Sequence, residues 1–89
     1  MGHNHKKENV LKRLKRIEGQ VRGLQKMVSE DTYCINVIVQ TSAVRQALSA
    51  VEDELLEAHL GSCVIDQIKK GREKNAKEEI LKVYRLKRK

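Results

Sequence analysis

The sequence contains no proline, phenylalanine or tryptophan, and it has only two cysteines and two tyrosines. Because proline breaks helices, its absence permits long ones. Five glycines in 89 residues leave few residues suited to turns. Leucine, isoleucine, valine and alanine must therefore form the core, which suits helix packing. No alternation of apolar and polar residues persists long enough to predict a sheet. We predict an all-α fold built from a few long helices.

Long apolar runs are also missing from the chain. No run approaches the roughly 20 residues that span a bilayer, and no signal-peptide core follows Met1. The protein is therefore expected in the cytoplasm, with no membrane partner. Thiols stay reduced there, so Cys34 and Cys63 are predicted to be ligands or reactive groups rather than a structural disulfide.

Positive charge is in excess, with a formal net charge of +7. Such a field favours a polyanionic partner, either nucleic acid or an anionic membrane surface, over the simpler role of solubilising helix faces. The sequence shows no glycine-rich phosphate loop and no convincing arrangement of serine, histidine and aspartate. We therefore expect a binding protein and not an enzyme.

Apolar residues recur every three or four positions in three segments, which predicts three amphipathic helices in one domain, 1–89. A polar and mobile segment, 1–6, precedes a first helix over about 7–29. A second, very long helix begins near Tyr33, capped by Asp31 or Thr32, and continues to Gly71, a glycine stop. A short third helix follows a capping-box pattern that starts at Asn75.

The lengths of these helices predict an oligomer. A helix of about 38 residues spans ~57 Å, and the shorter first helix cannot cover its apolar stripe. A second chain is needed to bury the remainder. The simplest solution is an antiparallel dimer in which two helices from each chain form a four-helix bundle.

His59, Cys63 and Cys34 form the candidate metal site. His59 and Cys63 are four residues apart, so a helix places both on one face. Cys34 precedes His59 by 25 residues, which is ~38 Å along a continuous helix, too far to share a site within one chain. In an antiparallel dimer, Cys34 of one chain would meet His59 and Cys63 of the other, giving two equal sites.

Two thiolates and one imidazole form a soft, three-ligand set that suits Cu(I). Zn(II) and Ni(II) would each require a fourth ligand. His3 or His5 could supply that ligand, so Ni(II) remains the alternative metal at this point.

Four segments of the chain resemble the copper-sensitive operon repressor (CsoR) family, which is related to the RcnR nickel/cobalt and FrmR formaldehyde regulators. The resemblance covers about 10–84, and its telling segments are 13–23 (RLKRIEGQVRG), Tyr33-Cys34, 40–44 (QTSAV) and 59–63 (HLGSC). It implies an all-helical antiparallel dimer that pairs into a tetramer. It also implies a repressor that binds double-stranded operator DNA without a helix-turn-helix, releases it when Cu(I) binds, and so derepresses copper-resistance genes.

The resemblance also implies roles for individual residues. Cys34, His59 and Cys63 look like the Cu(I) ligands, and Tyr33 and Glu79 like the pair that links the site to the third helix. The basic face that meets DNA would comprise Arg13, Arg16 and Arg45, with Lys12 and Lys15 as neighbours. Ala50 departs from the pattern, because copper-sensing members often place a basic residue there.

Other interpretations remain open on the sequence. One is a repressor of the same family that responds to Ni(II) or to reactive sulfur, although His59 argues against the sulfur-sensing branch. Another is a protein that does not bind DNA, such as a copper chaperone or a helical module on a membrane surface. The concentration of basic residues on the first helix favours a repressor over these last two.

Overall fold

The computed structural model describes residues 4–88 and is entirely helical over that range apart from its short connections. Its elements are α1 (Asn4–Ser29), α2 (Cys34–Ala58), the π-helical turn η1 (His59–Cys63), α3 (Val64–Lys69) and α4 (Glu73–Lys87). Helical elements follow one another without a break from Cys34 to Lys69, the range over which the sequence predicts one long helix. The all-α prediction is confirmed. The chain divides into two compact units, one reaching to Leu56 and the other starting at Glu57.

Helix α1 begins at Asn4, earlier than the predicted start near Lys7. Residues 4–6 carry no apolar periodicity, so the pattern of buried positions could not reveal that they continue the helix. The remainder of the predicted mobile segment, residues 1–3, lies outside the described residues. The other end of α1, Ser29, agrees with the prediction.

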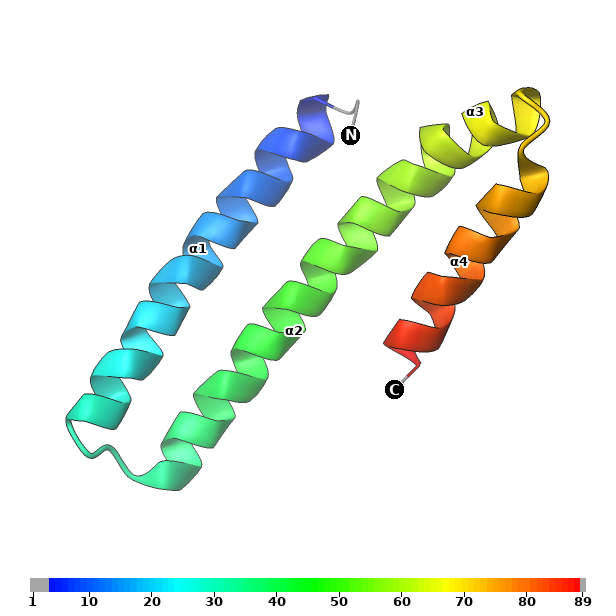
Figure 1. Cartoon of the computed structure of the whole chain (residues 1–89). Coiled ribbons are helices and arrows are strands. Elements are labelled where there is room, and N and C mark those ends of the chain that lie inside the picture. Colours follow the sequence, from blue (N-terminus) through cyan, green and yellow to red (C-terminus); the bar gives the residue numbers. More distant parts are fainter. Residues whose placement is uncertain (1–3, 89) are drawn as a thin grey trace. The chain divides into compact units, whose positions relative to one another are not determined.

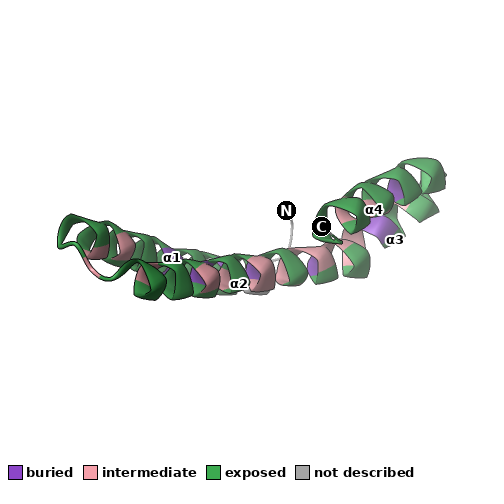
Figure 2. Ribbon diagram, turned by 90° about the horizontal axis from the view of Figure 1, so that it is seen from below, coloured by how far each residue is buried: buried purple, intermediate pink, exposed green. Residues whose placement is uncertain are grey.

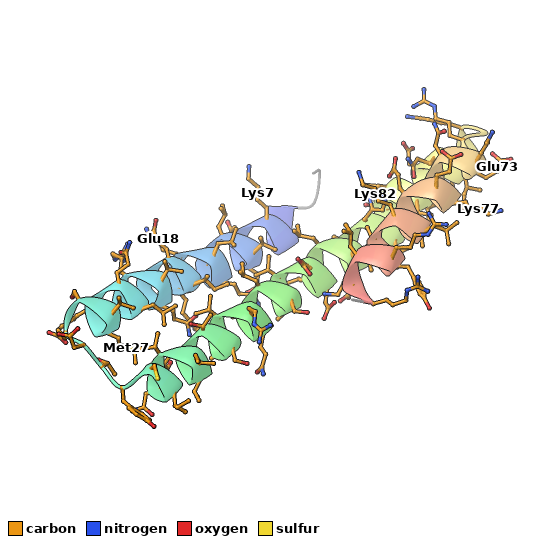
Figure 3. The ribbon with its side chains drawn as sticks, turned by 60° about the horizontal axis from the view of Figure 1, so that its bottom comes forward. Lys7, Glu18, Met27, Glu73, Lys77 and Lys82 are labelled. Carbon is orange, nitrogen blue, oxygen red and sulfur yellow. The ribbon has the colours of Figure 1, made fainter. Side chains whose placement is uncertain are left out.

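Helices α1 and α2 lie side by side and run in opposite directions, joined by a short loop (Figure 1). A small core holds them together, and its buried members are Val10, Ile17, Val44 and Val51, with Leu24, Ala47 and Leu55 packed against them. Figure 3 shows Met27 on the side of α1 that faces α2, whereas Lys7 and Glu18 project away from it. The two helices therefore form a hairpin with one apolar seam.

The loop between α1 and α2 is closed by Asp31, which adopts a positive φ of 57°. The Asp31 N–H donates to the Val28 carbonyl, and the Thr32 N–H donates to the Met27 carbonyl. This pair of bonds is a Schellman motif that terminates α1. The prediction that Asp31 or Thr32 caps α2 is wrong, because the Tyr33 carbonyl accepts the first N–H bonds of that helix.

The first helical segment of the second unit also ends in a Schellman motif. Gly71 has a φ of 74°, and its N–H donates to the Ile68 carbonyl, while the Arg72 N–H donates to the Gln67 carbonyl. The predicted glycine stop is confirmed. The predicted capping box at Asn75 is wrong, because α4 starts at Glu73 and places Asn75 inside its first turn.

The unit formed by η1, α3 and α4 has a core of small side chains. Its buried residues are Ala58, Val64 and Ala76, and Ala76 is only 3% exposed. Alanine at this position of α4 lets the helix approach α3 closely, because it has no side chain beyond Cβ. This packing turns α4 back on α3 and brings it beside η1.

Much of the apolar surface stays uncovered in a single chain. Figure 2 shows buried segments as small patches along largely exposed helices. On α2, Ile35, Ile38 and Val39 are each more than half exposed, although they belong to the predicted apolar stripe. On α1, Leu11 and Val28 are likewise more than half exposed. The α1–α2 hairpin therefore carries an apolar face that α1 and α2 do not bury against each other.

Candidate metal centre and basic face

The π-helical turn η1 begins at His59 and ends at Cys63. Its widened hydrogen bond runs from the Val64 N–H to the His59 carbonyl, five residues back. Single π turns within α-helices occur frequently at functional sites. Gly61 lies in the middle of the turn, and the Ser62 hydroxyl donates to the Ala58 carbonyl at 3.3 Å. Both predicted ligands of this region therefore belong to one irregular turn, a feature that the helical periodicity of the sequence did not reveal.

Glu79 reaches the imidazole of His59 from α4. The His59 Nε2 lies 3.2 Å from the Glu79 Oε2, which is ion-pair distance, although no hydrogen bond to Nε2 is aligned. The other carboxylate oxygen, Oε1, accepts a hydrogen bond from the Gln67 Nε2 at 3.2 Å. The carboxylate is thus held from two sides, by η1 and by α3. Gln67 is a member of this group that sequence reasoning missed.

Cys34 and Tyr33 lie at the other end of α2. Cys34 is the first residue of that helix and is exposed, and the side chain of Tyr33, one residue earlier, is 68% exposed. Helix α2 contains 25 residues, which corresponds to about 38 Å. Neither Cys34 nor Cys63 is in a disulfide. Among residues 7–88 of one chain, no three metal-binding side chains gather into one group.

Of the predicted histidine alternatives, His3 lies outside the described residues, and His5 falls in the first turn of α1. Within one unit, the structure brings His59 into contact with Glu79, and Cys63 lies in the same π turn as His59. It leaves Cys34 and Tyr33 exposed on the other unit.

The predicted basic face lies mostly on α1. On α1 it consists of four exposed residues, Lys12, Arg13, Lys15 and Arg16. Arg45, on α2, is also exposed. One of them, Arg13, has an acidic partner across the hairpin: its Nε lies 3.1 Å from the Glu54 Oε2. Arg13 follows Val10 by three residues and precedes Ile17 by four, so it borders the buried face. This spacing in the sequence could have indicated that the Arg13 side chain pairs with an acidic residue.

Comparison with known proteins decides the family. The model of a family described as metal-sensitive transcriptional repressors matches residues 6–86. The chain belongs to this family. It is 49% identical over 86 residues to the copper-sensing transcriptional repressor CsoR of Bacillus subtilis, covering 92% of this chain and 85% of that protein. It is also 49% identical over 70 residues to the copper-sensing transcriptional repressor RicR of Mycobacterium tuberculosis, covering 79% of this chain and 73% of that one.

A solved structure supports the same assignment. The crystal structure of the copper-sensing repressor CsoR with Cu(I) from Geobacillus thermodenitrificans superimposes with a TM-score of 0.89. The sequences are 44% identical, and the match covers all of this chain and 93% of the other. Membership in the metal-sensitive repressor family implies DNA binding, and repression is not a catalytic role. Within the part of the chain that the structure describes, no helix has the length and apolarity to span a bilayer.

Proposed function

We propose that this protein is a Cu(I)-responsive transcriptional repressor of the cytoplasm, which binds operator DNA without metal and releases it when Cu(I) binds. The observation that carries the proposal is the contact between His59 and Glu79 beside Cys63 in η1. The relatives reported above are named as copper sensors, which agrees with the chemistry of these side chains.

The donor set fits a soft monovalent metal. Because the Nε2 of His59 faces Glu79, the Nδ1 is the nitrogen that remains for a metal. A carboxylate beside the distal nitrogen of a ligating histidine orients the ring and selects its tautomer. When bound, Cu(I) supplies a centre that joins two thiolates and one imidazole. Cys63 contributes one thiolate from η1, and Cys34 contributes the second.

Cys34 is proposed to come from a second copy of the chain. Helix α2 starts at Cys34 and runs for 25 residues before η1 begins. The exposed apolar residues of the hairpin, including Ile35, Ile38 and Val39, need a covering surface. An antiparallel dimer covers them with the same face of its partner, and it sets the start of one α2 beside the end of the other. Two dimers are proposed to form the tetramer.

The basic face of α1 is proposed to meet the phosphate backbone of operator DNA. The sequence has no Phe or Trp and only two tyrosines, too few aromatic side chains to build a stacking platform for successive bases. Arginine and lysine contacts to phosphate are electrostatic, and they weaken as the salt concentration rises because the release of counterions then gains less free energy. Arg16 and Arg45 are exposed and available for such contacts.

Release from DNA requires that the metal-bound state bind DNA less well than the metal-free state. Glu79 belongs to α4 and contacts both His59 and Gln67. A change in the ring position of His59 is therefore transmitted to α4 through this carboxylate. Tyr33, which adjoins Cys34, is proposed to join the same network from the partner chain.

An anaerobic titration tests the proposal. The metal-free protein should shift a duplex selected from a random-sequence pool by that protein itself, and one Cu(I) per chain should abolish the shift. X-ray absorption of the copper complex should show two sulfurs and one nitrogen. A protein that releases DNA with Ni(II) or a persulfide, but not with Cu(I), belongs to the alternative branch of the family.

A further inference from the structure

Glu54 is the only acidic residue among residues 7–88 that is not exposed. Its side chain is 10% exposed, whereas those of the ion-paired residues Glu18, Asp66 and Glu79 are all more than half exposed. It follows Val51 by three residues and precedes Leu55, so it borders the apolar seam of the hairpin. A carboxylate in such a place loses most of its hydration.

Two side chains of α1 hold this carboxylate. The Arg13 Nε lies 3.1 Å from Oε2, and the Asn9 Nδ2 donates a hydrogen bond to Oε1. No hydrogen bond to Oε2 is aligned, so the contact with Arg13 is a charge pair. With both oxygens engaged by α1, the carboxylate is held in one orientation.

The stability of the hairpin alone does not explain why a carboxylate occupies this mostly buried position. Replacing a buried ion pair with well-packed apolar residues is often neutral or stabilising, and the flanking positions Val51 and Leu55 are apolar. The side chain of Arg13 nevertheless remains 48% exposed. Glu54 engages the Nε, which lies nearest the backbone, and the terminal guanidinium nitrogens extend beyond it.

We propose that Glu54 is a positioning residue for DNA binding, which holds the Arg13 guanidinium in one rotamer with its terminal nitrogens available to a phosphate. The inference rests on the proposed function, because it takes Arg13 as part of the DNA face. An arginine side chain carries considerable rotamer entropy, and a contact that orders it in advance removes that loss from the binding step. Arginine suits this arrangement because one guanidinium can serve two acceptors at once.

The test uses Glu54→Met, which keeps the length of the side chain and removes its hold on Arg13. This change also removes a negative charge near the DNA face, and charge alone would strengthen DNA binding. If Glu54 positions Arg13, affinity for the pool-selected duplex should instead fall about two- to tenfold, the range expected for ordering one long side chain. Glu54→Gln retains an oxygen that faces Arg13 and should bind DNA at least as tightly as the parent.

The same measurement in an Arg13→Ala background separates positioning from a structural role. Positioning predicts that Glu54→Met has no further weakening effect once Arg13 is absent. An equal decrease in both backgrounds would show that Glu54 only supports the hairpin, and unchanged or tighter binding by Glu54→Met would show that it only neutralises Arg13. Thermal unfolding of each variant reports whether the fold is retained.

Arg13→Lys provides a second variant that leaves Glu54 in place. Lysine has a single cationic nitrogen, so it cannot pair with Glu54 and still present further nitrogens to a phosphate. We expect its DNA affinity to fall nearly as far as that of Arg13→Ala, and full affinity of the lysine variant would overturn the proposal. Arg16→Ala serves as the control: weaker binding by this variant alone refutes the role of Glu54 and Arg13 but leaves the DNA face on α1. If neither Arg13 nor Arg16 affects binding, the proposed DNA face itself is wrong.

Discussion

The α1–α2 hairpin and the unit formed by η1, α3 and α4 are both helical, but different side chains pack in each. The hairpin has a seam of valine, isoleucine and leucine residues and leaves a second apolar face open. The other unit packs on alanine and valine, and it holds His59, Cys63 and Glu79 within one turn and its neighbouring helix. The hairpin thus leaves apolar surface open in a single chain, whereas the second unit brings a histidine and a carboxylate together locally.

The candidate metal ligands are divided between these two units. Contacts within a unit depend on short sequence separations, such as the 20 residues between His59 and Glu79, and α4 folds back to close that separation. Cys34 belongs to the hairpin and starts the 25-residue helix α2.

The first prediction concerns the sharing of ligands between chains. Cys34→Ala and Cys63→Ala should each lose tight Cu(I) binding, because each removes one thiolate from every site. When the two variants are unfolded together and refolded, mixed dimers should recover one intact site each. Copper retained per mixed dimer after competition with a chelator measures this recovery. Tight binding by either variant alone, or no recovery in the mixture, would place the ligands within one chain.

The second prediction concerns the contact between α4 and η1. Glu79→Ala should keep near-normal Cu(I) binding but lose roughly 1–3 kcal/mol of the coupling between copper and DNA, because His59 no longer reaches α4. The measurement is DNA affinity with and without saturating Cu(I). Glu78→Ala, the adjacent exposed residue of α4, is the matched control and should behave like the parent. Equal release by Glu79→Ala and the parent would exclude this route.

The third prediction compares the two apolar faces of the hairpin. Val51 is 4% exposed, so Val51→Ala should lower the free energy of unfolding by about 2 kcal/mol, because apolar burial is reduced and a cavity forms. Val39 is 57% exposed in one chain, so Val39→Ala would cost little in a monomer. If a second chain covers it, Val39→Ala should instead weaken dimerisation, detected as unfolding that depends more steeply on protein concentration. No effect of Val39→Ala on assembly would move the dimer interface elsewhere.

The fourth prediction compares basic residues of the two regions. Arg16→Ala should flatten the dependence of DNA affinity on salt by about one unit for each phosphate that the side chain no longer neutralises. Lys77, which projects from α4 in Figure 3, is outside the proposed DNA face. Lys77→Ala should therefore leave the slope nearly unchanged. The opposite result for the two variants would place the DNA face on α4.

The smallest expected effect concerns the two Schellman motifs. Gly71 has a φ of 74°, so Gly71→Ala should destabilise the protein by about 1 kcal/mol through the cost of a left-handed conformation with a Cβ. Asp31 already bears that cost at a φ of 57°, so Asp31→Gly should be neutral or slightly stabilising. Thermal unfolding of both variants measures the contrast. A destabilised Asp31→Gly would mean that the carboxylate has a role in the loop besides its backbone conformation.

The sequence by itself determined the helical class, the end of α1 at Ser29 and the stop at Gly71. These features depend on local periodicity and on backbone conformations available to few residue types, so neighbouring residues suffice to predict them. The chemistry of Cys34, His59 and Cys63 as a soft donor set also follows from residue type alone, as does the excess of positive charge. The sequence, through its resemblance to the repressor family, further indicated that Glu79 acts with the metal site.

Tertiary structure decided the features that depend on which side chains meet. It placed His59 and Cys63 in a π turn rather than a regular helix, and it brought Gln67 to the carboxylate of Glu79. It also started α4 at Glu73, where a local capping pattern predicted a later residue. Periodicity reports which face of a helix is apolar, but only packing determines which polar residue at the edge of that face finds a partner, as Arg13 and Glu54 do.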